Sequence, residues 1–196
     1  RDRSWGLRPI GNKDNKETKS NEAPQFYWLW TPMNFSNHCI FYHRNDDSLG
    51  KPWNCRAVID NLERNTRLEI SNPEIEINYK KNTRRINNLK IKLDDTELEF
   101  TTGRKFYMQG LGYTHPEWGH GNNHGQLKIG FDIIDLDKAE TELSKGLIHN
   151  LHIQTLSKIK FKTPKISNTG QGVIEQLFIG RHKPSDFEGI LDRITK

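Results

Sequence analysis

The strongest signal in the chain is the alternation of apolar and polar residues with a period of two. It is clearest in the segment Glu74–Tyr79, where Ile75, Ile77 and Tyr79 share one side and charged or amide residues occupy the other. A β-strand points successive side chains to opposite faces, so this period predicts strands with one buried and one solvent-facing side. The alternation recurs at positions 89–93, 97–100, 127–133 and 158–162. These segments predict antiparallel strands, because antiparallel sheets commonly have one wet face.

Two earlier segments are apolar on both sides. Phe26–Trp30 and Cys39–Tyr42 carry large side chains at consecutive positions, which is typical of strands in the middle of a covered sheet. Turn-forming residues separate the predicted strands at positions 45–50, 72–73, 94–96 and 102–103. One stretch predicts a helix, with Asp135 as its N-cap and Lys145–Gly146 as its end.

These segments amount to about ten short strands and one short helix, which predicts an all-β fold. Antiparallel strands of this number favour a lipocalin-like barrel or a curved sandwich. The chain has 196 residues, so we expect residues 1–196 to form a single β domain. A barrel of this size can enclose one small ligand, and we therefore expect an apolar hollow inside it.

Composition and charge exclude several classes of function. Mean hydropathy is -0.86 and no apolar run approaches the roughly 20 residues that a membrane-spanning helix needs, so we expect no membrane span. Two cysteines are too few for a disulfide framework, and we expect a cytoplasmic protein. Positions 145–183 hold seven Lys or Arg and one acid, and the lysines at 158–162 lie in a half-exposed or edge strand; a second basic group lies at 80–85, in a predicted turn. No DNA- or RNA-binding signature accompanies them, so we expect a solvated basic surface and no nucleic-acid partner.

The densest cluster of reactive side chains occupies positions 113–125, where histidines, a carboxylate, a phenol and an indole lie among glycines. A metal site built from His115, His120 and His124 is one interpretation. Their spacing matches no zinc signature, and we expect neither a metal nor a cofactor. The alternatives are a structural loop whose side chains bond to the backbone, or a loop that contacts a ligand at the mouth of the barrel.

A carboxylate near the C-terminus breaks an apolar pattern. Glu175 shares a predicted strand face with three apolar residues, which are Val173, Leu177 and Ile179. Burying an unpaired carboxylate is costly, so Glu175 is either paired or functional. The candidate partners are the arginines Arg1, Arg3 and Arg181. His149 and His152, on the preceding strand, are weaker candidates for a role in the site.

Three short motifs occur in order along the chain: Arg-Asp-Arg-Ser-Trp-Gly at 1–6, His-Pro-Glu-Trp-Gly-His-Gly at 115–121, and Gly-Gln-Gly-Val-Ile-Glu-Gln at 170–176 with Gly-Arg-His-Lys-Pro-Ser-Asp-Phe at 180–187. Together they resemble uncharacterised bacterial proteins related to the carotenoid 1,2-hydratase (hydroxyneurosporene synthase) family. The first motif is also similar to the Asp-His-Asn-Trp-Gly run of fungal relatives, which it matches at Asp2, Trp5 and Gly6.

The resemblance implies two successive lipocalin-like barrels in one polypeptide. This chain would be the C-terminal barrel, and its partner would be the N-terminal lipocalin-like domain of the same protein. The resemblance also implies hydration or isomerisation of a hydrophobic, isoprenoid- or polyene-like substrate without an organic cofactor.

Adding water to an alkene begins with protonation of carbon, which requires an acid that is still protonated at neutral pH. Burial in an apolar cavity raises the pKa of a carboxyl group and so meets this requirement. Asp2 is the first candidate acid, because it lies in the matching motif. Glu175 is the second, because it shares a predicted strand face with apolar residues. His115 or His120 would position or deprotonate water. The aromatic side chains expected to hold the substrate and stabilise a cation are Trp5, Trp28, Trp30, Tyr113 and Trp118.

Two other functions remain open from the sequence. The first is a non-catalytic lipocalin-like module that binds an apolar small molecule, and the second is a supporting barrel that only closes a site on its partner. An acid that lacks a basic partner favours the enzyme, whereas an acid tied to a base favours the binding module.

Overall fold

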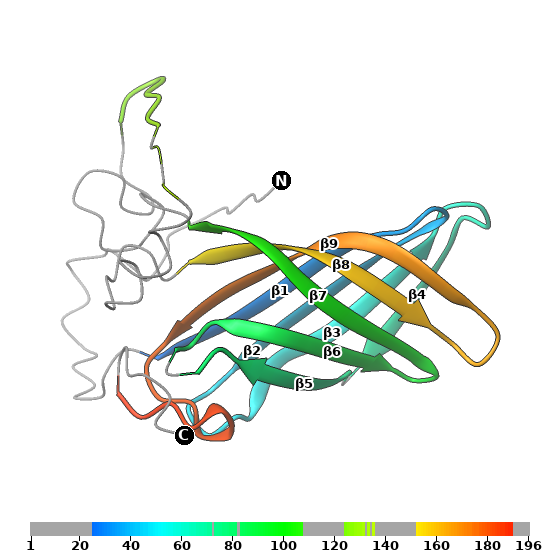
Figure 1. Ribbon diagram of the computed structural model, residues 1–196, viewed down its shortest axis with the longest axis horizontal. Coiled ribbons are helices and arrows are strands. Elements are labelled where there is room, and N and C mark those ends of the chain that lie inside the picture. The colour runs from blue at the N-terminus through cyan, green and yellow to red at the C-terminus, as the bar shows by residue number, and fades with distance from the viewer. Residues whose placement is uncertain are drawn as a thin grey trace.

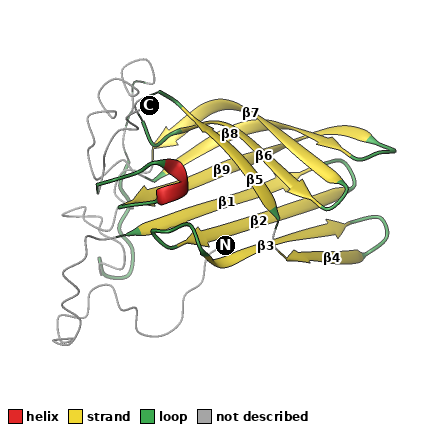
Figure 2. Cartoon of the chain, turned by 90° about the horizontal axis from the view of Figure 1, so that it is seen from below, coloured by secondary structure: helices red, strands yellow, loops and turns green. Residues whose placement is uncertain are grey.

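The structure is a computed structural model that describes residues 25–71, 73–81, 83–107, 124–131, 133, 135 and 152–189. In these residues nine antiparallel strands form one curled sheet, and the only helix is a short 3-10 turn (Figures 1 and 2). The elements are β1 (Phe26–Asn34), β2 (His38–Asp46), β3 (Pro52–Asn61), β4 (Thr66–Ser71), β5 (Glu74–Tyr79), β6 (Ile86–Leu93), β7 (Thr96–Tyr107), β8 (Ile153–Lys162), β9 (Ser167–Ile179) and η2 (Lys183–Ser185). The predicted all-β antiparallel fold is therefore confirmed, in the form of a half-barrel.

The order of strands in the sheet is β4-β3-β2-β1-β9-β8-β7-β6-β5. The runs β1 to β4 and β5 to β9 are both meanders, and the pairing of β1 with β9 joins them. The edges of the sheet are β4 and β5, which follow one another in the sequence. The two strands that are apolar on both sides, β1 and β2, lie inside the sheet, as the sequence predicts.

The face that the curled sheet turns inward carries the hydrophobic core. Alternation brings Leu29, Ile40 and Leu89 to this face, and none of the three has exposed surface. They belong to a single cluster of buried side chains that runs across the sheet. Burying a side chain of this size contributes about 1.5–3 kcal/mol, so this packing is the main source of stability.

Four of the five segments with a period of two are strands or parts of strands, in β5, β6, β7 and β8. In β8, Ile159 is buried while Lys158 and Lys160 are exposed. Because β8 lies between β7 and β9, it is a half-exposed inner strand and not an edge strand. The lysines therefore mark the wet face of the sheet.

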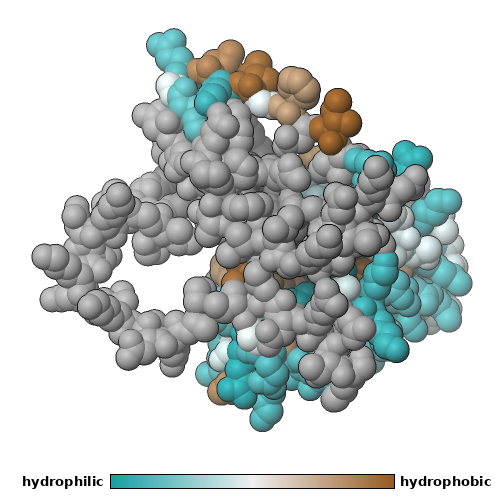
Figure 3. Space-filling model, turned by 60° about the vertical axis from the view of Figure 1, so that its left-hand side comes forward, coloured by the Kyte–Doolittle hydropathy of each residue, from teal (hydrophilic) through white to brown (hydrophobic). Residues whose placement is uncertain are grey.

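The predicted strand at 127–133 is wrong. None of its described residues belongs to a strand, and its apolar side chains are 79–92% exposed. The segment projects from the sheet, and its apolar side chains stand out at the upper edge of the surface (Figures 1 and 3). A period of two becomes a strand only where a neighbour supplies the ladder hydrogen bonds, and no described strand pairs with this segment. The predicted helix lies outside the described residues, apart from Asp135.

Residues 180–189, here called the C-terminal clasp, join two distant turns of the sheet. Lys183 N donates to Ser48 O (2.8 Å) in the turn between β2 and β3. The guanidinium of Arg84, in the turn between β5 and β6, donates to Gly180 O (2.6 Å) and Gly189 O (2.8 Å). Gly50 has a φ of +85° and no room for a Cβ beside Pro184, so only glycine suits the first turn.

The basic turn at 80–85 is only partly the solvated surface that the sequence predicts. Lys80 and Lys81 are exposed, but Arg84 and Arg85 are buried. The Arg84 guanidinium lies 4.4 Å from the ring centroid of Phe187 in the clasp. Two of the four positive charges therefore stabilise the fold, and the charged surface is smaller than the sequence indicates.

Two further predictions concern the environment of the chain. No described segment forms a helix with the length and hydropathy that a membrane crossing needs. Cys39 and Cys55 are both free thiols.

Candidate functional site

A row of side chains crosses four neighbouring strands on the face opposite the core. His43 of β2 pairs with Trp30 of β1, Trp30 with Glu175 of β9, and Glu175 with Gln154 of β8. Residues opposite one another in antiparallel strands lie on the same face, so these four form one row, here called the outer row. Their chain neighbours point into the core; these are Leu29, Tyr42, Ile153 and Ile174. The register alone therefore places Glu175 outside the curled sheet.

Glu175 is nevertheless buried, with its side chain 10% exposed. Its Oε1 accepts a hydrogen bond from Nε2 of His152 (2.9 Å), and its Oε2 accepts one from Nε2 of Gln154 (2.7 Å). His152, just before β8, is two residues from Gln154 and reaches the same carboxylate. Because Nε2 of His152 donates to Glu175, the neutral ring carries its lone pair on Nδ1. No described residue bonds to that Nδ1, and the side chain is 18% exposed.

These contacts determine the charge of Glu175. Burial raises the pKa of its carboxyl, but the hydrogen bonds and charge of His152, the amide of Gln154 and the nearby indole of Trp28 together lower the pKa below its ordinary value of 4.5. Glu175 is therefore a carboxylate at neutral pH. Because Glu175 shares a strand face with apolar residues, its carboxyl was a candidate acid with a raised pKa. The lowered pKa contradicts that expectation. The described partners of Glu175 are a histidine and an amide, and not Arg181.

His43 is held in one tautomer by the amide of Asn54. Asn54 Nδ2 lies 2.9 Å from His43 Nδ1 and 3.0 Å from Asn45 Oδ1, so both amide hydrogens are used. This leaves the proton of neutral His43 on Nε2, which is buried and has no hydrogen-bond partner among the described residues. Burial and the charge of Arg56 lower the pKa of His43 against the opposing effect of Glu175. His43 therefore presents a neutral N–H donor in the outer row.

Two of the aromatic residues predicted to contact a ligand lie together on this face. Trp28 and Trp30 alternate with core residues of β1, and the ring of Trp28 packs edge-on against His43 at 4.4 Å between centroids. The Nε1 of Trp28 is buried, and its indole is one of the groups that lower the pKa of Glu175. The outer row, with His152 and Trp28, is hereafter the outer-face site.

The other predicted site residues lie outside the described residues; these are Asp2, Trp5, Tyr113, His115, Trp118 and His120. Their assignments stay predictions. Among the residues that the structure describes, no group of three or more His, Cys, Asp or Glu side chains could hold a metal.

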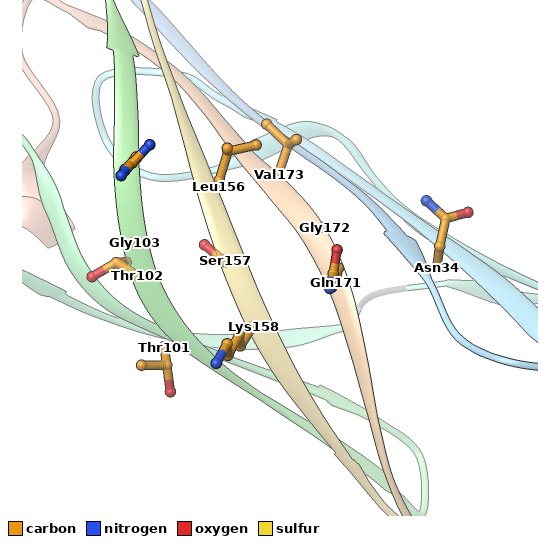
Figure 4. Close-up of a pocket in the computed structure, with 11 residues that line it drawn as sticks. Asn34, Thr101, Thr102, Gly103, Leu156, Ser157, Lys158, Gln171, Gly172 and Val173 are labelled. Carbon is orange, nitrogen blue, oxygen red and sulfur yellow. The ribbon is translucent and has the colours of Figure 1, made fainter.

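The same face is hollowed beside the outer row (Figure 4). The depression has a volume of about 600 Å³ and is lined by Asn34, Thr101, Thr102, Gly103, Arg104, Leu156, Ser157, Lys158, Gln171, Gly172 and Val173. Leu156 and Val173 are cross-strand partners, two residues along from Gln154 and Glu175. A register shift in β7 between Thr102 and Lys105 carries Gly103 and Arg104 to the rim. The depression therefore continues the outer-face site along the strands.

A second carboxylate–imidazole pair, which the sequence reasoning missed, anchors the clasp. His182 Nε2 lies 3.1 Å from Asp46 Oδ2, and His182 Nδ1 lies 2.8 Å from Ser185 Oγ. Tyr79 Oη lies 2.7 Å from the same Ser185 oxygen. The order Ser, His, Asp is that of a hydrolase triad. The motif at 180–187 contained His182 and Ser185, but nothing in the sequence brought Asp46 to them.

Every group of this triad is already used within the fold. Asp46 also accepts hydrogen bonds from Nε of Arg44 at 2.8 and 2.9 Å, which offset its charge. The ring of His182 stacks on Tyr27 at 4.0 Å between centroids. The backbone N–H groups of Ser185 and Asp186 donate within the turn and cannot stabilise an oxyanion. The arrangement is a structural anchor for the clasp.

Comparisons with known proteins concern the fold. The model of a family described as "Family of unknown function (DUF8625)" matches residues 1–188. Kievitone hydratase from Nectria haematococca has 13% identity and a TM-score of 0.45, and the match covers 78% of this chain and 39% of that chain. An AttH-like protein from Nitrosomonas europaea has 8% identity and a TM-score of 0.42, with 81% and 41% covered. The chain thus spans about two-fifths of the length of either. No curated protein matches it.

Proposed function

The chain belongs to a family of unknown function (DUF8625), and from its outer-face site we propose that it is a cofactor-independent hydratase or isomerase that transfers protons on a hydrophobic substrate. The observation that carries the proposal is the pairing of buried, ionised Glu175 with His152, whose Nδ1 bonds to no described residue, beside Trp28 and Trp30. A carboxylate that fixes an imidazole is a recurrent device for moving protons at neutral pH.

His152 supplies the base. Glu175 and its bond to Nε2 orient the ring, so that Nδ1 can take a proton from a water molecule. The imidazolium that forms is then stabilised by the adjacent carboxylate. General base catalysis of this kind contributes about 10²–10⁴-fold in rate.

The acid is assigned to Asp2 on the sequence resemblance alone. Because Glu175 is ionised, it does not protonate the alkene. In the proposed reaction, Asp2 gives its proton to one alkene carbon, the water oxygen bonds to the other, and the second proton of that water passes to His152. Solvent returns the proton from His152 to Asp2. His115 and His120 remain proposed alternatives for positioning the water.

Aromatic faces hold the isoprenoid- or polyene-like substrate and the cation formed on it. Trp28 and Trp30 supply two of them from the described residues. Each face contributes about 0.5–2 kcal/mol to binding of a cation. Trp5, Tyr113 and Trp118 are proposed as further contacts.

The test is incorporation of deuterium from heavy water into isoprenoid alcohols and polyenes, followed by mass spectrometry. His152→Gln is expected to lower incorporation about 10²–10⁴-fold at unchanged thermal stability. The control is His38→Gln, which changes a histidine stacked on Phe35 at the start of β2. Full incorporation by the His152 variant would remove the base assignment.

A binding module is the second candidate, and one observation favours it: the acid that the structure describes at this site is tied to a base. A module of this kind would retain an unaltered apolar molecule through purification, identifiable by mass spectrometry. It would incorporate no deuterium, and His152→Gln would leave retention unchanged.

The remaining proposals rest on the resemblance. An N-terminal lipocalin-like domain of the same polypeptide is the proposed partner, and the cytoplasm is the proposed location. The deuterium assay should therefore also be run on the longest natural polypeptide that contains this chain. Activity seen only there would assign part of the machinery to that domain.

A further inference from the structure

The depression beside the outer row has an unbalanced charge. Of its lining residues two are cationic, Arg104 and Lys158, and none is acidic. Neither cation forms an ion pair with a residue that the structure describes. A concave surface lined by one sign of charge raises the local concentration of ligands of the opposite sign.

The register of β8 distinguishes Lys158 from the other lysines of its strand. Lys160 lies opposite Glu99, and Lys162 lies opposite Glu97, both on β7. Lys158 instead lies opposite Thr101 on β7 and Gln171 on β9. Of the three lysines on this face, the one in the depression is thus the one without a carboxylate opposite it.

An apolar step separates Lys158 from the outer row. Leu156, 56% exposed, and its partner Val173 lie between Lys158 and Gln154 along the strands. Figure 4 shows these two side chains near one end of the depression and Lys158 with Thr101 toward the other. At about 3.3 Å per residue, the six residues from His152 to Lys158 span about 20 Å. The surface is therefore long and apolar in its middle; Lys158 lies at its far end, and Arg104 flanks Leu156 on the β7 side.

We propose that this site takes an anionic amphiphile, a lipophilic chain that ends in a carboxylate. The carboxylate lies on Lys158, and the chain runs over Leu156 and Val173 toward Trp30. Because Glu175 is itself a carboxylate, it repels the anionic end and so sets the orientation of the chain. The inference deepens the proposed function by naming its substrate class.

The test measures binding of a fluorescent long-chain fatty acid by the full chain. Lys158→Gln is expected to weaken binding about three- to tenfold, the range for loss of one partly exposed charged contact. Lys160→Gln removes the same charge two residues away, where Glu99 stands opposite, and is expected to leave affinity unchanged. Lys158→Arg is expected to retain it. The methyl ester of the fatty acid should bind as weakly to the wild type as the acid does to Lys158→Gln, and added salt should narrow the difference.

Equal weakening by the Lys158 and Lys160 variants would overturn the proposal, since a diffuse positive field would then explain the binding. Equal affinity for the acid and its ester would also overturn it. A third arm uses phosphatidylglycerol vesicles: sedimentation that depends on Lys158, without binding of the free fatty acid, would assign the surface to a membrane instead. The binding assay requires no turnover, so failure of the proposed reaction would leave its outcome unaffected, and the two failures are distinguishable.

Discussion

Two carboxylate–imidazole pairs lie on opposite faces of the same curled sheet. Asp46 and His182 lie on the inner side, where the clasp meets the core, with side chains 1% and 5% exposed. Glu175 and His152 lie on the outer side, with side chains 10% and 18% exposed. The nitrogen–oxygen distances are similar, 3.1 and 2.9 Å. Distance therefore does not distinguish the pair assigned to chemistry from the pair assigned to structure.

The pairs differ in whether the imidazole has a ring nitrogen that no described residue bonds. Both nitrogens of His182 are used, its ring is stacked, and its carboxylate is shared with Arg44. His152 uses one nitrogen on Glu175, and no described residue bonds to the other. A proton can be moved only by a group with an unoccupied lone pair that a substrate can reach. Unused hydrogen-bonding capacity next to a depression is therefore the better mark of function than a short contact.

The largest effect is expected from breaking the inner pair. Asp46→Asn keeps the shape but removes the charge that Arg44 and His182 face, and loss of one partner from a buried pair costs about 3–5 kcal/mol. Urea denaturation should show this loss in the free energy of unfolding. The control, Asp60→Asn, removes the carboxylate of the exposed pair with Arg67 and should change the unfolding free energy far less. Equal effects would show that the clasp anchor is not a buried pair in solution.

A smaller effect is expected from removing the hydroxyl of the inner triad. Ser185→Ala leaves His182 Nδ1 and Tyr79 Oη without their shared partner, at a cost of about 1–3 kcal/mol. Deuterium incorporation should be unchanged. A fluorophosphonate probe should not label Ser185 in the wild type. Labelling at Ser185, or loss of turnover in the alanine variant at full stability, would make this triad the reactive site and reverse the comparison.

The smallest effect concerns the pH dependence of the outer pair. Because the folded pKa of Glu175 is lowered from 4.5, its ionised form contributes stability that is fully present above pH 4.5 and is lost as the pH falls through the folded pKa. Glu175→Gln should therefore flatten the decline of the unfolding free energy below pH 4.5. Parallel curves for the two proteins between pH 3 and 6 would contradict the lowered pKa.

The predictions from the sequence succeeded where the pattern of apolar and polar residues within one strand is sufficient to identify it. The periods of two at 74–79 and 158–162 identified β5 and part of β8, and the doubly apolar segments identified inner strands. The same rule failed at 127–133, because alternation describes a strand's two faces without supplying the neighbour that pairs with it. Likewise, charge counting placed Arg84 on the surface, whereas the carbonyls of the clasp draw it inside.

The candidate site was harder to predict because it is made by register. Glu175 stood out by its apolar phase, but His152 reaches it only because β8 and β9 pair Gln154 with Glu175. A shift of one residue in that hairpin would turn the outer row to the other face. The turn residues at 163–166 and 168–170 would both permit a hairpin, so the sequence left the register open.

The sequence by itself determined that the chain forms antiparallel strands, which strands are inner, and that Glu175 is either paired or functional. Each of these follows from the local alternation of side chains and the cost of burying charge. Only the tertiary structure decided which face holds the core, which base meets which acid, and that a depression lies beside the outer row. Those outcomes depend on register and on contacts between residues far apart in the chain, and no local pattern encodes them.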